Sequence, residues 1–541
     1  MSCTYTEACY ILKSLLSIAL IFISISETRL TLSFTMNKYL FLFATLIVVN
    51  GGKAFGQDIR TKRHQEVAYL LKSYAESVPD TLRGLTPNQW NSRVRELYAA
   101  VDSSKSADDY YMALCNFGAL INDYHSAFPN SGFLNRNKIF TKADTVLPLW
   151  VKNWSDGRTF LVKDYTGNIP ANAELLTING QSAQVLSLRL RDLNPGEDRY
   201  AFPLMNERTQ PDIRSWMNFS NLLFIKKVRP PFTFTYREYG DTALKTVTLR
   251  GMMRDSIFQV YKQLGDKRRV RKSIKYSRKP VEYARVNSQV RVLTINLFYG
   301  KNILQMLLWG GDNRYNKLLR SCMKQVKCDG VTTLVIDIRG NPGGFLGSVN
   351  QTMGYLTDSS FNEKEVFKVS TKTKVTALPL LKNTYRLFYG KSHRALVDSS
   401  VAIFKRMPNG GLFPLDTLLP LVYKPKQQQH QFLGKVYVLT DARCYSGSIV
   451  FCNMIQQSNR GIIAGESPGG YAQVTGGSTV AVQGPTYRYV RMNPTYSLDL
   501  VLGMPDYTYV KVDLPLEITL DQWLNGKDDR LENLLKIVTK E

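Results

Sequence analysis

Histidine and cysteine are scarce in this 541-residue sequence, and their scarcity excludes several kinds of site. Only four histidines occur: His64, His125, His393 and His430. Seven cysteines occur, and no Cys or His pair has the spacing of a zinc site, so we expect no metal and no other cofactor. The five cysteines beyond residue 56 are expected to be core thiols, although an oxidising compartment would permit a disulfide: Cys115, Cys322, Cys328, Cys444 and Cys452.

Long apolar runs are absent after residue 56. Before that point lie two such runs, residues 12–26 and the run that follows Met36, Asn37 and Lys38. The second run fits a secretory signal, because a basic start, about a dozen apolar residues and a small-x-small pair (Ala54, Gly56) succeed one another. The alternative is a membrane anchor made by the first run, which is short for a span of about 20 residues.

We therefore predict that residues 1–56 are a signal and targeting region, that Met36 is the true start and that cleavage precedes Gln57. The protein is then exported, to the periplasm, the cell envelope or the medium.

Acidic residues are in deficit, with 44 Asp and Glu against 70 Lys and Arg, which gives a net charge of +26. Such a charge attracts an anionic partner, either nucleic acid or an anionic membrane or envelope surface. The densest basic run, Lys267–Lys279, lacks the interleaved aromatics of a base-stacking surface and matches no nucleic-acid fold motif. We expect a solvated linker over residues 256–280, a candidate envelope partner and no nucleic acid.

The rest of the chain divides by pattern. Residues 57–140 are expected to form a helical domain, because Val94, Leu97, Tyr98 and Val101 recur at helical spacing. Residues 145–255 show short strands and turns, and the phrase IPANAELLTINGQ at 169–181 resembles the core of a PDZ domain, a module that binds extended peptides. Residues 281–541 alternate strands with helices, as in a layered α/β domain, and strands are expected at 331–338, 435–440 and 461–466.

Within that α/β domain, Ser446 is predicted on a tight turn between a buried strand (435–440) and a helix (449–457). The turn exposes the hydroxyl near a helix N-terminus, whose partial positive charge favours a developing oxyanion. Taken alone, a Ser-Gly-Ser sequence at a helix start is most often a cap. A nucleophilic serine also needs a base and a group that orients the base.

Four segments in fixed order carry a family resemblance: LVIDIRGNPGG (334–344), VYVLTDARCYSGS (436–448), GIIAGESPGG (461–470) and GMPDYTYV (503–510). They resemble the signatures of the tail-specific and tricorn-type serine peptidases. The resemblance implies a crotonase-like α/β core, serine peptidase activity and peptide or protein substrates. It implies Ser446, rather than Ser448, as the nucleophile, with oxyanion amides at Gly343 or Gly344 and at Gly447.

The sequence departs from the Ser–Lys members of that family, because Tyr471 stands where their lysine is expected. Tricorn-type relatives use a histidine instead, and the sequence around His125 (NDYHS) resembles their D-x-H-(S/T) motif. His125 is therefore the expected general base, since imidazole titrates near neutral pH. The resemblance offers Asp499 as the third, acidic member, with Glu466 as the second candidate.

Together these features predict an exported serine endopeptidase with a Ser-His-acid mechanism. The alternative is a catalytically inactive peptide- or ligand-binding envelope protein on the same fold.

Overall fold

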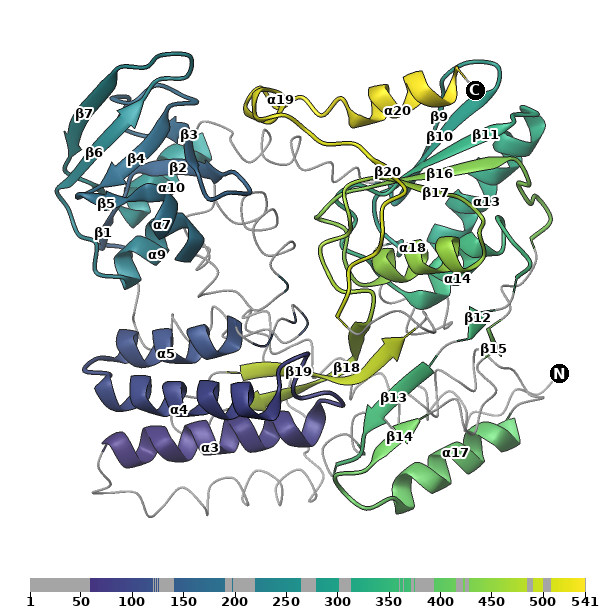
Figure 1. Cartoon of the computed structure of the whole chain (residues 1–541), viewed down its shortest axis with the longest axis horizontal. Helices are drawn as coiled ribbons and strands as arrows, with labels where there is room; N and C mark the ends of the chain where they lie inside the picture. Colours follow the sequence, from purple (N-terminus) through teal and green to yellow (C-terminus); the bar gives the residue numbers. More distant parts are fainter. Residues whose placement is uncertain are drawn as a thin grey trace, which may run out of the picture.

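The structure is a computed structural model of the whole chain (Figure 1). The predicted signal region, Met36, Gln57 and residues 267–278 of the basic run lie outside the residues that it describes. Those residues are 59–119, 121, 123, 125, 141–189, 197, 219–263, 279–300, 313–359, 361–362, 364–370, 374, 394–414, 422–423, 428–483, 490–499 and 507–540.

The first element is a helical layer made of α3 (Ile59–Ser77), α4 (Pro87–Ser103) and α5 (Ala107–Ala119). Helix α4 begins with a capping box, in which Thr86 Oγ1 accepts the Gln89 amide and Gln89 Oε1 accepts the Thr86 amide. Leu97 and Val101 are buried in the core, so the predicted helical stripe faces inward.

The second element is a β-rich module with an antiparallel sheet in the order β2–β3–β4–β6–β7. Its IPANAELLTINGQ segment forms β4 (Glu174–Ile178), and the Asn179–Gly180 turn, with both residues at positive φ, leads into β5 (Gln181–Ser182). The predicted module boundary at residue 255 falls inside helix α10. The other elements are β1 (Thr145–Val146), β2 (Leu149–Asn153), β3 (Thr159–Asp164), β6 (Phe232–Arg237), β7 (Leu244–Leu249), β8 (Met252–Met253), α7 (Ala183–Leu188), α9 (Phe219–Ile225) and α10 (Arg254–Gln263).

The third element is a six-stranded sheet in the order β20–β17–β16–β11–β10–β9, parallel except for β9. The strands expected at 331–338, 435–440 and 461–466 are β11, β16 and β17, which confirms a mixed α/β fold. The bounds are β9 (Val281–Arg285), β10 (Val290–Ile295), β11 (Thr333–Asp337), β16 (Lys435–Thr440), β17 (Ile462–Gly465) and β20 (Leu514–Pro515).

This sheet is buried on both faces, as expected of parallel strands. Leu334 and Ile336 of β11 belong to the core formed with α13 (Asn313–Cys328), α14 (Leu346–Met353) and α18 (Gly447–Gln457). Val335, between them, packs in a separate cluster with Leu534 and Val538 of α20 (Arg530–Val538). The alternation explains why all five residues of β11 are buried.

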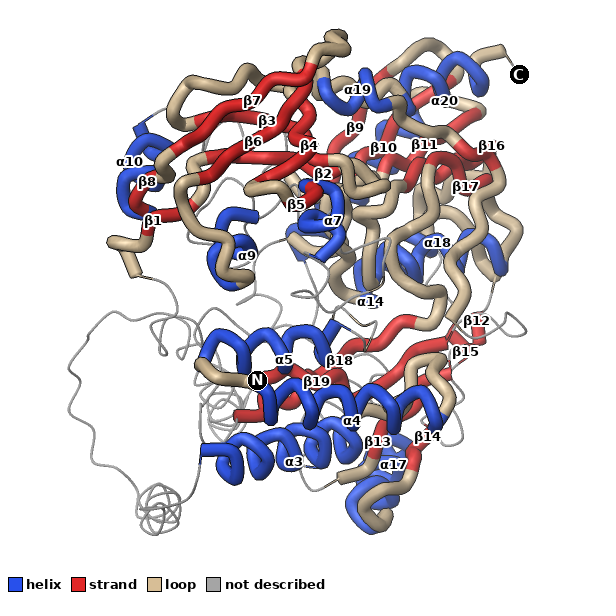
Figure 2. The backbone as a smooth tube through the Cα atoms, turned by 60° about the vertical axis from the view of Figure 1, so that its left-hand side comes forward, coloured by secondary structure: helices blue, strands red, loops and turns tan. Residues whose placement is uncertain are grey.

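A long ribbon extends from the α/β unit toward the helical layer (Figure 2). It consists of β18 (Val474–Gln483) and β19 (Val490–Asp499), and both strands contact α3. The edge of β19 that faces away from β18 pairs with β13, and in this pairing Asp499 lies opposite Lys364. The adjoining elements are β12 (Phe361–Asn362), β13 (Lys364–Lys368), α17 (Arg394–Arg406), β14 (Leu412–Pro414) and β15 (Val422–Tyr423).

The C-terminal segment joins the module to the α/β unit, passing between them at the top of Figure 1. On the module side, Trp523 of α19 (Leu520–Leu524) packs edge-on against Trp154 and Phe160, with ring centroids 5.1 and 6.0 Å away. On the other side, α20 covers the parallel sheet. Within the described ranges, no helix combines the length and the apolar character needed to cross a bilayer.

Candidate active site

Ser446 lies between β16 and α18 with a backbone φ of 55° and ψ of −120°. A positive φ is rare for a residue with a side chain and costs about 1–3 kcal/mol, so the surrounding structure must hold it. Although Ser446 occupies the N-cap position of α18, its side chain makes no cap hydrogen bond. Ser448 behaves differently, because its buried hydroxyl donates to the Asn341 carbonyl at 2.9 Å. The strained turn therefore presents the Ser446 hydroxyl instead of using it as a cap.

His125 contacts that hydroxyl. Its Nε2 lies 3.2 Å from Ser446 Oγ, although 321 positions separate the two residues in the sequence. The His125 ring also lies against Tyr445, with ring centroids 5.1 Å apart and planes inclined by 39°. The structure thus brings together the predicted nucleophile and the predicted base at a distance that permits proton transfer.

Asp123 is the acidic residue described beside His125. Its side chain is fully buried, and Oδ1 accepts the His125 backbone amide at 3.0 Å. The same oxygen lies 3.7 Å from His125 Nδ1, which is beyond a hydrogen bond but close enough to stabilise an imidazolium. Sequence reasoning assigned Asp123 no role, although it is the Asp of the D-x-H motif that singled out His125.

The two acidic residues that the sequence suggests as the third member, Asp499 and Glu466, lie in different parts of the structure. Asp499 ends β19, and its side chain lies outside what the structure describes, so its role stays a prediction. Glu466 accepts the Ala442 amide at 3.4 Å and pairs with Arg530 at 3.0 Å. In the part of the chain that is described, the Glu466 carboxylate makes no contact with His125.

The glycine turn after β11 closes the site on the other side. Gly343 and Gly344 have φ of 100° and 147°, and a Cβ on Gly343 would meet the Gly447 amide nitrogen at 2.7 Å. The Gly343 amide donates to Asn341 Oδ1 at 2.8 Å, whereas the Gly344 and Gly447 amides have no acceptor among the described residues. The Phe298 amide donates to the Gly343 carbonyl, and the Phe298 carbonyl accepts the Phe345 amide. The Gly344 amide, between these two bonds, therefore points away from Phe298. The sequence left Gly343 and Gly344 as alternatives, and the hydrogen bonds favour Gly344.

A cavity of about 370 Å³ opens beside Ser446. Aromatic and aliphatic groups form most of its wall, and Phe345 is 42% exposed at its edge. The cavity therefore suits an apolar side chain better than a charged one. Its lining residues are Tyr299, Pro342, Gly343, Gly344, Phe345 and Ser446.

Comparisons with known proteins bear on this site. The family model of peptidase family S41 matches residues 292–494, which contain the glycine turn and Ser446. The match identifies residues 292–494 as a peptidase family S41 region. The chain is accordingly a serine peptidase, and the predicted family resemblance is confirmed. His125 lies outside the matched residues.

Solved structures of CPAF share this fold at low identity. Mature CPAF complexed with lactacystin has a TM-score of 0.58 and 14% identity, and the match covers 88% of this chain and 97% of that chain. The photosystem II D1 C-terminal processing protease (TM-score 0.38, 12% identity, 84% and 93% coverage) and the tricorn protease (0.35, 13%, 90% and 37%) are more distant. No curated protein sequence matches significantly.

The chain carries an aromatic cluster around Tyr471, which stands where the Ser–Lys members of the family are expected to have their lysine. The Tyr471 ring packs against Tyr507 and Tyr509, with centroids 5.7 and 5.0 Å away. The Arg83 guanidinium lies 5.8 Å from the same ring. A tyrosine therefore stands where a lysine base is expected, and the base that contacts Ser446 in the described part of the chain is His125.

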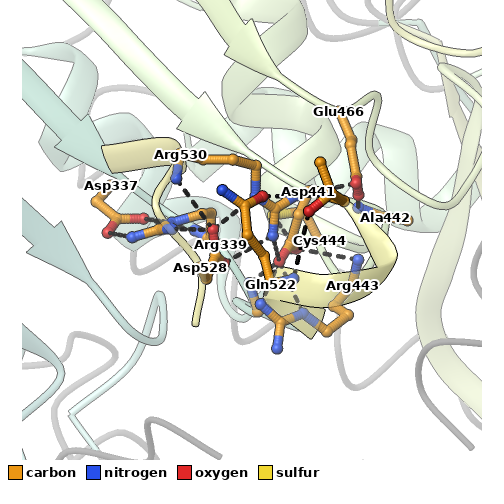
Figure 3. A network of polar contacts seen from close by, with 12 residues as sticks. Asp337, Arg339, Asp441, Ala442, Arg443, Cys444, Glu466, Gln522, Asp528 and Arg530 are labelled. Carbon is orange, nitrogen blue, oxygen red and sulfur yellow. Dashed lines mark hydrogen bonds and ion pairs between the residues drawn. The ribbon is translucent and has the colours of Figure 1, made fainter. Parts of the chain in front are cut away.

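A network of largely buried ion pairs connects the two turns of the candidate site to the C-terminal segment (Figure 3). Asp441 Oδ1 accepts the Gly340 amide at 2.9 Å and the Arg443 amide at 3.0 Å, so one carboxylate joins the glycine turn to the nucleophile turn. Arg530 of α20 lies 3.7 Å from Asp441 and 2.7 Å from Asp528. Although burial opposes ionisation, Arg443 and Arg530 hold the pKa of Asp441 below its ordinary value.

Replacing Arg530 with methionine should therefore destabilise the protein by about 3 kcal/mol, because it leaves buried carboxylates without part of their counter-charge. Burial opposes the ionisation of Asp528 too, but Arg530 lowers its pKa below the ordinary value. Groups with lowered folded pKa stabilise the protein above about pH 4 and lose that contribution as the pH falls further. Urea unfolding at pH 7 and at about pH 3 measures both effects, and the loss caused by R530M should be smaller at the lower pH.

The matched control is Arg93→Met, which removes the exposed pair between Arg93 and Glu96. That pair should contribute less than about 1 kcal/mol. Equal losses in R530M and R93M would contradict a role for the buried network.

Proposed function

We propose that this chain is an exported serine endopeptidase in which Ser446 attacks the peptide bond and His125 is the general base. The distance of 3.2 Å between Ser446 Oγ and His125 Nε2, at a turn strained to a φ of 55°, carries the proposal. An acidic side chain completes the group, with Asp499 as the residue that the family resemblance suggests.

In the first half of the reaction, the Ser446 hydroxyl gives its proton to His125 Nε2 while Oγ bonds to the substrate carbonyl carbon. The imidazolium then forms beside the Asp123 carboxylate, whose Oδ1 lies 3.7 Å from Nδ1. Collapse of the tetrahedral intermediate breaks the C–N bond. His125 returns the proton to the departing amine, and an acyl-enzyme remains.

In the second half, water replaces the amine. His125 takes one proton from the water as its oxygen bonds to the acyl carbon. The bond from that carbon to Ser446 Oγ then breaks, and the proton returns to Oγ. The products are an amine and a carboxylic acid, and the enzyme is restored.

The carbonyl oxygen becomes negatively charged in both halves. The Gly344 and Gly447 amides are the donors available to it, and Gly447 is the first residue of α18. The partial positive charge of the helix N-terminus adds to their effect. One such donor typically contributes about 3 kcal/mol to stabilisation of the transition state.

The substrate is a peptide or protein chain with an apolar side chain next to the cleaved bond. This preference follows from the walls of the cavity beside Ser446, especially Tyr299 and Phe345. We further propose that the α/β unit is crotonase-like and that the β-rich module binds peptides in the PDZ manner. Export to the periplasm or beyond rests on the signal-like sequence before Gln57, and the net charge of +26 favours contact with an anionic envelope surface.

Fluorophosphonate labelling of the full chain tests the proposal, because the probe reacts only with an activated serine. We expect about one probe per chain, located by mass spectrometry on the tryptic peptide 444–460 that contains Ser446. Replacing His125 with alanine should slow labelling by about 10³-fold or more, since the serine loses its base. His64→Ala is the matched control, because His64 pairs with Asp102 on the helical layer, and it should label at the parent rate.

Two results would contradict the proposal. A parent protein that does not label would favour the alternative of an inactive peptide- or ligand-binding protein. Labelling that persists in the His125→Ala protein would show that another group activates the serine.

A further inference from the structure

A buried glutamate from a distant part of the chain lies against the nucleophile turn. Glu197 is 2% exposed, and the Tyr445 hydroxyl donates to its carboxylate, 2.8 Å from Oε2 and 3.1 Å from Oε1. Tyr445 directly precedes Ser446, whereas Glu197 lies 248 positions away, between helices α7 and α9. This contact joins the turn to a separate part of the fold.

Tyr445 contacts both reacting groups. Its ring packs on His125 at 5.1 Å, and its backbone leads into Ser446. Its carbonyl oxygen accepts the Ser448 amide at 3.1 Å, which fixes the start of α18. Because Tyr445 is 4% exposed and closely packed, a shift of its ring would move Ser446 and His125 relative to each other.

The Arg83 guanidinium supplies the positive counter-charge of the buried Glu197 carboxylate. Its Nη2 lies 3.3 Å from Glu197 Oε1, and both side chains are almost inaccessible to water. The guanidinium also lies over the rings of Tyr471 and Tyr507, 5.8 and 5.7 Å from their centroids. Burying an ion pair weakens its net contribution to stability, so its presence at this turn calls for a role other than stability.

The electrostatics of the group support such a role. Burial raises the pKa of Glu197 to about 7; Arg83 opposes the rise and the nearby Asp123 carboxylate adds to it. Carboxylates perturbed in this way gather at functional sites more often than in purely structural positions.

We propose that Glu197 is a positioning residue of the active site, which holds the Ser446 turn against His125 through the Tyr445 hydroxyl and the Arg83 guanidinium. The inference rests on the proposed Ser446–His125 mechanism and adds a residue to it. Glu197 acts through Tyr445 and takes no part in proton transfer. Losing the contact should therefore slow the reaction of Ser446 and leave binding of a small probe nearly unchanged.

The test compares the full chain with E197Q, Y445F and the E197Q/Y445F double variant, using a fluorophosphonate over a range of concentrations. E197Q keeps the size of the side chain and removes its charge, and Y445F keeps the ring and removes only the hydroxyl. We expect kinact to fall by about 10- to 100-fold in each single variant, with KI within about twofold of the parent value. The double variant should be no slower than the slower single variant, because both changes act on the same contact between Tyr445 and Glu197.

The matched control is E174Q, in which Glu174 loses its charge but not its place beside Arg237 in the module. It should leave kinact unchanged. Parent labelling at Ser446 combined with unchanged kinact in E197Q and Y445F would overturn this inference alone. A parent that does not label would overturn the proposed function and this inference with it. If E197Q fails to fold, Y445F decides between the two results.

Discussion

Replacing Ser446 with alanine will lower kcat for hydrolysis of an unstructured protein substrate such as casein by about 10⁴-fold or more, and will abolish fluorophosphonate labelling. The change removes the hydroxyl oxygen that forms the acyl-enzyme in the proposed mechanism. Ser446 has no cap hydrogen bond to lose, so the midpoint of urea unfolding should shift little. Relief of the positive φ does not follow, because alanine also has a Cβ.

Ser448→Ala is the matched control, two residues further along the same helix start. Ser448 is fully buried and donates to the Asn341 carbonyl at 2.9 Å, so its loss should cost about 1 kcal/mol of stability. Labelling and kcat should stay within about threefold of the parent. If S448A rather than S446A abolished labelling, Ser448 would be the nucleophile and the assignment would be wrong.

Replacing Gly343 with alanine will lower the labelling rate by about 10²-fold or more, although Gly343 itself is not expected to bind the oxyanion. Its Cβ would lie 2.6 Å from the Tyr445 carbonyl, 2.7 Å from the Gly447 amide nitrogen and 2.8 Å from Ser446 Cβ. Backbone atoms cannot yield as a flexible side chain does, so the nucleophile turn must move away from the glycine turn. That movement separates the Gly344 and Gly447 amides and misplaces Ser446.

The matched control for this prediction is Gly340→Ala in the same turn. Gly340 also has a positive φ, of 71°, so it carries the same kind of backbone strain. Its Cβ would meet only the Arg443 guanidinium, at 3.6 Å, which is ordinary contact. G340A should lose about 1–2 kcal/mol of stability through its positive φ, and G343A should lose more because of its backbone clash. Only G343A should lose labelling. Equal labelling rates in the two variants would contradict the role given to the close approach.

Much of the fold followed from local patterns. The strands expected at 331–338, 435–440 and 461–466 are present because runs of buried β-branched and aliphatic residues specify a parallel strand without help from elsewhere. The helical stripe through Leu97 and Val101 likewise points into the core as its spacing predicts. The predicted module boundary at residue 255 falls inside α10, whose first turn contains Asp255.

The sequence by itself singled out Ser446 as the predicted nucleophile and His125 as the predicted base, because each lies in a short motif that resembles a signature of the family. It could not determine which residues surround them. Asp123, Arg83, Glu197 and Tyr445 come from three distant parts of the chain, and only the tertiary structure brings their buried charges together. The choice of Gly344 over Gly343 also depended on a long-range contact, the pairing with Phe298. A buried charge is stable only when a partner reaches it, and which partner does so is decided by packing rather than by local sequence.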